Sequence, residues 1–258
     1  MRFARLLASM AVGTLVLAGC AAQPVTTKGP TSTPWGEIDG RPGRAGVVVA
    51  APHGTSDRGT DEIATEISRR TGFGLVVATG FSIGRDADDG QSRRYHVNRP
   101  LEGAPGLRAA DERPSEPARR VYQQYEQRVR EVSAGPLAFY VEIHGNNRRE
   151  SANRIEIATV GVDREYAQRL RALCELIRDA HLRGHAGAPR LDVLIEPADQ
   201  IYYTASAAKR DGILKLPQRA LHFELPASAR AEWRELYAAI LADFITEAIA
   251  LRPLRTAH

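Results

Sequence analysis

The chain has 258 residues, of which 43% are hydrophobic and 26% charged, enough for one sizeable globular domain. Its formal charge of +4 falls to +2 once Arg2 and Arg5 of a predicted signal segment are removed, and its arginine clusters are short and lack aromatic neighbours. These features argue against nucleic acid as a partner and favour a small anionic substrate.

Residues 1–19 have the features of a bacterial export signal. Arg2 and Arg5 precede an apolar stretch, Leu6 to Leu17, that is too short to cross a bilayer as a permanent helix. The tetrapeptide Leu17-Ala18-Gly19-Cys20 resembles a bacterial lipobox. That resemblance implies cleavage before Cys20 and its diacylation, so we expect a lipid-anchored protein of the bacterial cell envelope. The alternative is a plain secretory signal with an incidental cysteine.

Residues 20–45 are rich in proline, glycine, threonine and serine, and we predict that they form a flexible tether. A single folded domain is predicted to span residues 46–252. Its cysteine, Cys174, has no disulfide partner once Cys20 is lipidated. Because Cys174 has helical spacing with Leu170 and Ile177, we expect it to be a small buried side chain.

Strand and helix patterns alternate along this domain. The predicted strands are Val47–Ala51, Phe73–Phe81, Leu137–Gly145, Arg154–Gly161, Leu191–Glu196 and Arg219–Pro226. The predicted helices are Thr60–Arg70 with Gly59 or Thr60 as its cap, Pro117–Val132, Asp163–His181, and Ser228–Leu251 with Ser228 as its cap. The polar segment Ser82–Pro117 is predicted to be a long functional loop. The alternation predicts an α/β fold with three layers, α/β/α, around a mixed, largely parallel central sheet.

Side chains that can bind a metal or carry a proton stand at the predicted strand ends. His53 follows the first strand, His144 ends another, and Glu224 lies near the end of the last. In α/β sheets the carboxyl ends of strands form the ligand-binding edge. A catalytic zinc site takes three protein ligands and leaves one position open. We therefore predict His53, Asp57 and His144 as ligands of Zn²⁺ and Glu224 as the general base; the alternative is that His53 and Asp57 belong to an ordinary polar turn.

Several neighbouring residues allow two interpretations. Glu142 precedes His144 on the same strand face and either orients that ligand or pairs with an arginine. His222 shares a face with Glu224 and is either a proton shuttle or a packed core histidine. Tyr202 and Tyr203, which precede the last strand, either cover the site or have no part in it.

Four segments carry a resemblance to a known family: APHGTSDRGTDEIATEIS at 51–68, YHVNRP at 95–100, VEIHG at 141–145 and LHFELP at 221–226. They resemble the N-formylglutamate amidohydrolase family and its relatives, including zinc-dependent poly-γ-glutamate hydrolases, within the zinc carboxypeptidase-like fold. The resemblance covers nearly the whole domain and implies the same three zinc ligands and the same base. It also implies that Asn98 and Arg99 bind the carboxylate of the substrate.

The chain departs from that family in two places. The family pattern has an aspartate two residues before the Asn-Arg pair, where this chain has His96. Many relatives have a glutamate in place of Asp57, so Asp61 and Glu62 remain alternative acidic ligands.

The predicted site and the resemblance together imply an amidohydrolase that cleaves an N-acyl, γ-glutamyl or peptide bond beside a free carboxylate. Its substrate would be a small acidic amide or peptide. One alternative is an aspartoacylase-type hydrolase of N-acyl amino acids or esters. Another is an envelope lipoprotein that binds a ligand without catalysis. The presence of three candidate ligands together with Glu224 favours the enzyme.

Overall fold

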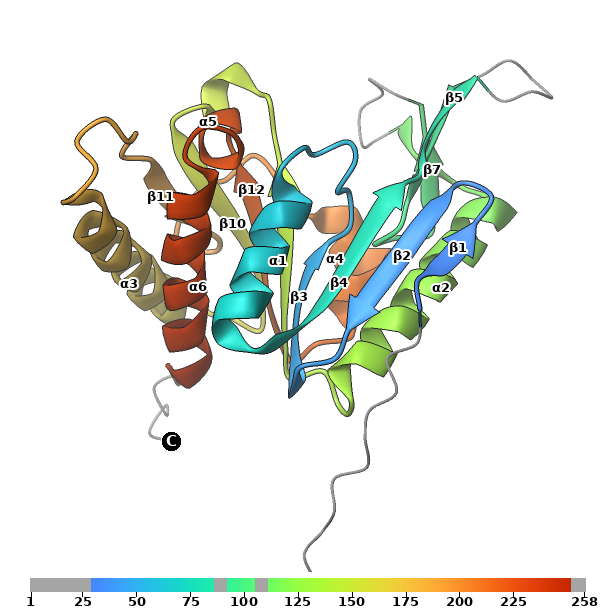
Figure 1. Cartoon of the computed structure of the whole chain (residues 1–258), viewed down its shortest axis with the longest axis horizontal. Helices are drawn as coiled ribbons and strands as arrows, with labels where there is room; N and C mark the ends of the chain where they lie inside the picture. The colour runs from blue at the N-terminus through green and yellow to red at the C-terminus, as the bar shows by residue number, and fades with distance from the viewer. Residues whose placement is uncertain (1–28, 86–91, 105–110, 252–258) are drawn as a thin grey trace, which may run out of the picture.

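The computed structural model describes residues 29–85, 92–104 and 111–251, and its central element is a mixed sheet with helices on both faces (Figure 1). The eight strands follow the spatial order β1-β2-β4-β3-β9-β12-β10-β11. Their bounds are β1 Thr31–Thr33, β2 Gly36–Arg41, β3 Arg44–Ala51, β4 Phe73–Gly80, β9 Phe139–Gly145, β10 Arg154–Val160, β11 Asp192–Ile195 and β12 Arg219–Leu225.

The central strands β4, β3, β9 and β12 all run parallel. Strands β10 and β11 are parallel to each other but antiparallel to β12, and β1 and β2 continue the sheet beyond β4 in antiparallel pairs. The predicted three-layer α/β/α fold with a mixed, largely parallel sheet is therefore confirmed.

Strand β3 shows why this sheet is covered twice. Its residues from Val47 to Ala51 are all buried, although successive side chains point to opposite faces. Val47, Val49 and Ala51 belong to one apolar cluster, and Val48 and Ala50 belong to the other. A continuous apolar run of this kind is typical of a parallel strand with helices on both faces.

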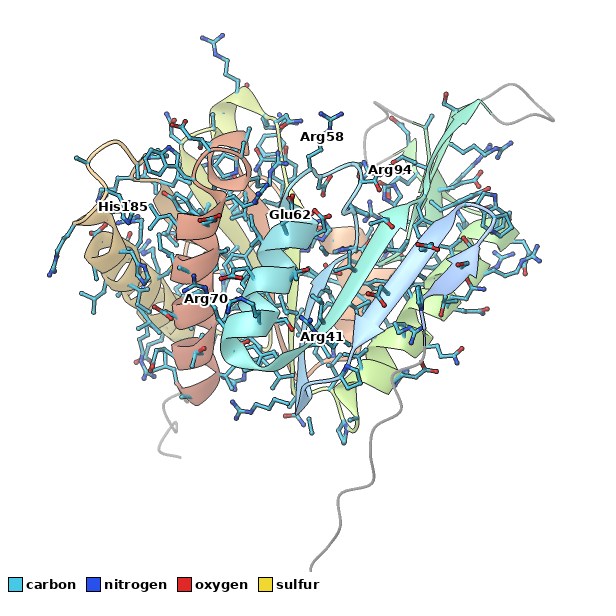
Figure 2. The ribbon with its side chains drawn as sticks, in the orientation of Figure 1. Arg41, Arg58, Glu62, Arg70, Arg94 and His185 are labelled. Atoms are coloured by element: carbon cyan, nitrogen blue, oxygen red, sulfur yellow. The ribbon has the colours of Figure 1, made fainter. Side chains whose placement is uncertain are left out.

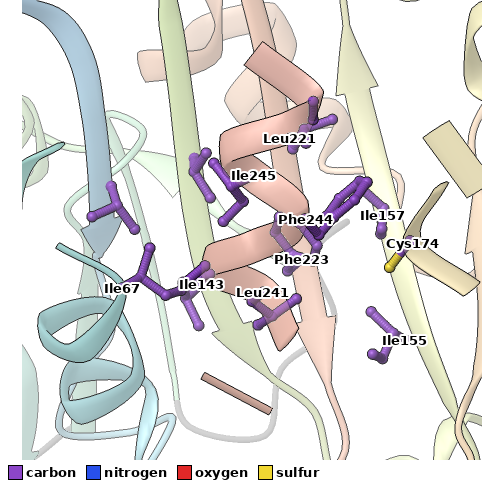
Figure 3. Close-up of a cluster of buried hydrophobic side chains, with 14 of the residues drawn as sticks. Ile67, Ile143, Ile155, Ile157, Cys174, Leu221, Phe223, Leu241, Phe244 and Ile245 are labelled. Carbon is purple, nitrogen blue, oxygen red and sulfur yellow. The ribbon is translucent and has the colours of Figure 1, made fainter. Parts of the chain in front are cut away.

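Four longer helices and several short ones form the outer layers in the described part of the chain. Helices α1 (Thr60–Thr71), α3 (Arg164–Leu182) and α6 (Arg234–Ala250) cover one face, and α2 (Glu116–Ser133) and the short α4 (Ser206–Asp211) cover the other (Figure 1). Figure 3 shows the larger cluster, in which Phe244 of α6 packs edge-on against Phe223 at a ring-centroid distance of 6.1 Å. Cys174 is buried there, as expected.

The carboxyl ends of β3, β9 and β12 lie at one edge of the sheet. Because β9 and β12 are paired in parallel, His144 is the direct neighbour of Glu224. His53 follows β3 by two residues, and β3 pairs with the other side of β9. The topology thus brings the three predicted strand-end residues to the same edge.

The prediction that Ser82–Pro117 is one long loop is wrong for the part of this segment that the structure describes. That part forms a second, antiparallel sheet of β5 (Ser82–Arg85), β6 (Ser92–His96), β7 (Leu101–Gly103) and β8 (Arg113–Pro114). This small sheet stands beside the carboxyl ends of the central strands (Figure 1). Its strands are short and mostly polar, so they lack the apolar alternation that identifies a strand in sequence.

The predicted tether also needs correction, because β1 and β2 lie within residues 20–45 and belong to the main sheet. Ile38 of β2 is completely buried, and Arg128 of α2 donates hydrogen bonds to the Gly29 carbonyl and the Thr31 hydroxyl. Glycine, threonine and proline are common in linkers, and a single buried isoleucine is too weak a signal to outweigh that composition.

The predicted helix Ser228–Leu251 is interrupted. A single turn, α5 (Ala227–Arg230), precedes α6, and Trp233 rather than Ser228 stands at the start of the longer helix. The break leaves Arg230 directed toward the strand ends, as described below. Gly59, one of the two proposed caps of α1, does occupy the cap position in a left-handed conformation with a φ of 86°.

The predicted signal segment 1–19 and Cys20 lie outside the described residues. None of the helices that the structure describes combines the length and apolarity needed to span a bilayer.

We predict that Ile38→Ala lowers the free energy of unfolding by about 2–5 kcal/mol, the usual cost of truncating a buried isoleucine. Chemical denaturation monitored by circular dichroism measures this change. The matched control is Leu176→Ala, because Leu176 is 65% exposed and its truncation should change stability by less than about 0.5 kcal/mol. Equal stability of both variants would mean that residues 31–41 are a tether after all.

Candidate metal centre

One buried guanidinium, that of Arg230, holds together the loops that follow β3, β9 and β12. It donates hydrogen bonds to the carbonyl oxygens of Arg58, Asn146 and Leu225 at 2.5, 3.1 and 3.1 Å. Gly145 is required here, because a Cβ atom at that position would lie 2.4 Å from the guanidinium carbon. The strand-end loops are thereby fixed relative to one another.

Within this frame, Asp57 stands between two histidines. Its Oδ2 atom lies 3.5 Å from His53 Nδ1 and 3.4 Å from His144 Nδ1. The turn is closed by a hydrogen bond of 2.8 Å from the Asp57 amide to the His53 carbonyl, and the Gly145 amide donates to Asp57 Oδ2 at 3.3 Å. The three predicted zinc ligands therefore converge on one small volume, with all three donor atoms within 4.8 Å of one another.

These distances fit a zinc ion. Zinc binds nitrogen and oxygen ligands at about 2.0–2.2 Å in tetrahedral sites, so neighbouring ligand atoms lie about 3.3–3.5 Å apart. Two of the three contacts in the cluster have that separation. Three protein ligands also leave the fourth tetrahedral position for water or substrate, as catalytic zinc sites require.

The charge state of the acid suits this role. Burial raises the pKa of the Asp57 carboxyl, but hydrogen bonds to His144 and His53 outweigh burial and hold that pKa well below its usual range. Burial lowers the pKa of His144, but hydrogen bonds to Asp57 and Glu142 outweigh it and raise the pKa to about 10. The metal-free protein thus holds a proton on His144 where a cation would bind.

The geometry selects Asp57 over the two alternative acids. Neither Asp61 nor Glu62 belongs to the group of adjacent donor atoms around His53 and His144. Glu62 is exposed and forms an ion pair with Arg234 of α6 at 3.1 Å.

Behind His144 lies Glu142, a completely buried carboxylate. Its Oε2 atom is 3.3 Å from His144 Nε2 and 2.8 Å from His222 Nδ1, and Asn98 donates to both of its oxygens at 3.3 Å. Burial raises the pKa of Glu142, but hydrogen bonds from His144 and His222 outweigh it and hold that pKa well below its usual range. The sequence allowed Glu142 either to orient His144 or to pair with an arginine, and the structure shows the contact with His144. A carboxylate in this position orients a ligating imidazole.

Glu224 stands next to this cluster without joining it. Its Oε1 atom lies 3.4 Å from His222 Nε2, and its neighbour across β9 and β12 is His144. The rings of His222 and His144 are stacked at 4.2 Å. His222 therefore lies between Glu142 and Glu224 and contacts both carboxylates.

The small sheet contributes the two residues that the resemblance assigns to substrate binding, and both have protein partners. Asn98 is completely buried against Glu142. Arg99 donates to both oxygens of Glu112 at 2.8 and 2.7 Å and to Asn98 Oδ1 at 2.9 Å. His96 Nε2 lies 3.0 Å from the same Glu112 carboxylate. Glu112 has no counterpart in the sequence motifs and was not predicted.

The charges of this second cluster follow from its burial. Burial lowers the pKa of His96 to about 4 despite the hydrogen bond to Glu112, so the ring is neutral at neutral pH. Burial also opposes ionisation of Glu112, but hydrogen bonds from His96 and Arg99 outweigh it and lower that pKa to about 2.

Arg94 is a second site residue that the sequence did not reveal. Its Nη2 atom donates to the Ser56 hydroxyl at 3.0 Å and lies 3.8 Å from Asp57 Oδ1. With 28% of its side chain exposed, it is more accessible than Arg99, at 14%. Figure 2 shows Arg94 at the same edge as Arg58, near the ends of the central strands. Arg94 alternates with His96 in β6, and this alternation could have indicated that both side chains face the site. The signal was missed because the segment was predicted to be a loop.

Tyr202 and Tyr203 lie in the segment before β12 and are held by Glu156, which accepts hydrogen bonds from both backbone amides at 2.6 and 3.0 Å. The Tyr202 side chain is 53% exposed, and the guanidinium of Arg148 lies 3.5 Å from its ring centroid. The two tyrosines therefore form an outer rim with Arg148 and contact none of the predicted ligands.

No family model matches the chain, and no curated protein matches it either. Among solved structures, a bacteriophage poly-gamma-glutamate hydrolase is 14% identical, with 85% of this chain and 90% of that chain covered and a TM-score of 0.48. The gene product Atu2144 from Agrobacterium tumefaciens is 15% identical, with 83% and 93% covered and a TM-score of 0.47. The N-acetylmuramoyl-L-alanine amidase AmiC2 of Nostoc punctiforme is 15% identical, with 82% and 100% covered and a TM-score of 0.36. Values this low describe a general likeness of fold and assign no function to this chain.

We predict that zinc binding releases close to one proton per chain at pH 7. The raised pKa of His144, about 10, keeps its imidazole protonated there, and a metal must displace that proton. The apparent zinc affinity should therefore increase as pH rises from 6 to 9, by about tenfold per pH unit. Calorimetric titrations of zinc in buffers with different ionisation enthalpies measure both quantities. An affinity that does not change with pH would show that His144 is not a ligand.

Proposed function

We propose that this protein is a lipid-anchored, zinc-dependent amidohydrolase that cleaves an N-acyl, γ-glutamyl or peptide amide bond beside a free carboxylate. The observation that carries the proposal is the convergence of His53, Asp57 and His144, with Asp57 Oδ2 at 3.5 and 3.4 Å from the two imidazole nitrogens and Glu224 at the same sheet edge. The motif resemblance to N-formylglutamate amidohydrolases supports the same residues. Attachment to a membrane of the cell envelope rests on the lipobox-like sequence before Cys20.

The ligand atoms would be His53 Nδ1, His144 Nδ1 and Asp57 Oδ2. Zinc at this position would act as a Lewis acid that polarises the scissile carbonyl, and it would lower the pKa of the attacking water. Glu224 accepts a proton as the water oxygen forms its bond to the carbonyl carbon. The same carboxyl group returns a proton to the amide nitrogen when the carbon–nitrogen bond breaks.

His222 orients the Glu224 carboxylate for this transfer. Its Nδ1 atom is anchored on Glu142, so the ring position is fixed, and its Nε2 atom reaches Glu224. An anchored neighbour reduces the rotamers open to Glu224 and keeps the base in one geometry.

The free carboxylate of the substrate needs a cation, and we assign this role to Arg94. Arg99 donates hydrogen bonds to Glu112 and to Asn98, and the Glu112 carboxylate neutralises the charge of the Arg99 guanidinium. Arg94 is more exposed and lies beside the ligand Asp57. Its guanidinium can bind a carboxylate through two parallel hydrogen bonds.

We predict that Glu224→Gln keeps the zinc but lowers kcat by about 10²–10⁴-fold, the usual contribution of a general base. His144→Ala should lose the metal and the activity together. Metal analysis of the purified variants, with hydrolysis assays on N-acyl amino acids and γ-glutamyl amides, separates the two effects. If Glu224→Gln loses zinc as completely as His144→Ala, Glu224 is a ligand and not the base. If the parent protein takes up no zinc, the proposal fails.

We further predict that Arg94→Ala lowers kcat/KM by about 10–100-fold on a substrate with the free carboxylate, the value of a hydrogen bond to a charged group. The loss should disappear on the same substrate with a carboxamide in that place. Arg70→Ala is the matched control, because Arg70 lies on α1 away from the edge and pairs with Glu66 (Figure 2). An equal loss on both substrates would contradict the assignment of Arg94 to the carboxylate.

A further inference from the structure

Two buried imidazole nitrogens next to the metal centre have no hydrogen-bond partner among the described residues: His53 Nε2 and His96 Nδ1. Their rings belong to adjacent side chains, with centroids 5.6 Å apart and planes at 65°. A buried polar atom without a partner is destabilising and calls for an explanation. The two orphan atoms lie on neighbouring rings, so one explanation can account for both.

The tautomer of His96 is set by Glu112. The Glu112 carboxylate is ionised and can only accept, and it lies 3.0 Å from His96 Nε2. His96 must therefore carry its single proton on Nε2. Its Nδ1 atom is left as a hydrogen-bond acceptor.

The tautomer of His53 depends on what occupies the site. Its Nδ1 atom faces Asp57, and in the metal-free protein that nitrogen holds the proton. If Nδ1 uses its lone pair to bind a cation, the proton has to be on Nε2. His53 Nε2 then becomes a donor on the ring next to that of His96, whose Nδ1 atom is an acceptor.

We propose that His96 and Glu112 form a positioning chain for the metal ligand His53, in which His53 Nε2–H donates to His96 Nδ1 directly or through one water. This inference rests on the proposed function. A centroid separation of 5.6 Å lets one water bridge the two nitrogens, or lets them bond directly when the side chains move closer. The chain continues to Arg99, whose guanidinium holds both oxygens of Glu112.

The two metal-binding histidines are then supported in the same way. His144 has the carboxylate of Glu142 behind it, and Asn98 holds that carboxylate. His53 has His96 and the carboxylate of Glu112 behind it, and Arg99 holds that carboxylate. In this arrangement Asn98 and Arg99 act as positioning residues for the metal centre.

The first test is the zinc affinity of the full-length protein and its His96 variants, measured by competition with a chromogenic chelator. We expect His96→Ala to weaken zinc binding by about 10–100-fold, as is usual when the outer partner of a ligand is removed. His96→Asp should restore much of the affinity, because an aspartate can accept the same proton. Arg99→Ala should weaken zinc binding in the same direction. The control is His185→Ala, which removes an exposed histidine far from the site (Figure 2).

The second test reads the tautomers directly. Long-range ¹H–¹⁵N spectra of the zinc-loaded protein should show the proton of both His53 and His96 on Nε2. In the metal-free protein the His53 proton should move to Nδ1, while that of His96 stays on Nε2. A general loss of packing would not produce this pattern, so the spectra distinguish a positioning role from a merely structural one.

Three results would overturn the inference: zinc affinity unchanged in His96→Ala, no recovery in His96→Asp when His96→Ala is weakened, or a His96 proton on Nδ1. If Arg99→Ala raises KM and leaves zinc affinity intact, Arg99 binds the substrate as the family resemblance implies. Arg99 would then not belong to the positioning chain of His96 and Glu112. Failure of the parent to bind zinc would instead overturn the proposed function. The two failures are therefore distinguishable.

Discussion

The guanidinium of Arg230 connects the three loops from which the centre is built, and the position of every ligand depends on it. A buried cation is stable only where acceptors surround it, and here the carbonyl groups of three loops supply them. Burial lowers the pKa of Arg230, while the negative charges of Asp57 and Glu224 favour its charged form. The two acids therefore help to hold the cation that fixes their own loops. This requirement also explains the interruption between α5 and α6, which leaves Arg230 pointing at the strand ends.

Glu142 is the complementary constraint, a completely buried anion in the middle of β9. It is neutralised and hydrogen-bonded by two histidines, an asparagine and Tyr140, whose hydroxyl donates at 3.2 Å. Removing one partner of a buried charge leaves that charge uncompensated, so a substitution of any one of these groups affects the whole cluster. The same carboxylate contacts His144 on one side and His222 on the other. A metal ligand and the neighbour of the general base are therefore positioned by one group.

The main sheet and the convergence of the candidate ligands at its edge could be predicted from sequence because each leaves a local signal. Strand β3 carries a continuous apolar run, β9 and β12 are largely apolar, and His53, His144 and Glu224 stand near the carboxyl ends of these strands. Ile38 left no such signal, since a lone apolar residue among polar ones identifies neither a strand nor a linker. The pairing of Arg99 was also hidden. Its partner Glu112 comes from a distant segment, brought close by strands of two to five residues whose pattern is too short to detect.

The small sheet matters to the metal centre because a single stretch of it reaches all three ligands. Arg94 lies beside Asp57, His96 packs against His53, and Asn98 holds the carboxylate behind His144. Arg94 and His96 alternate along β6, so the period of a strand directs them to the same side, and Asn98 follows in the turn after β6. If the small sheet shifted relative to the main one, all three contacts would be lost together. The candidate metal centre therefore depends on the packing of the two sheets, and the segment that resembles a surface loop in sequence is part of the framework of the site.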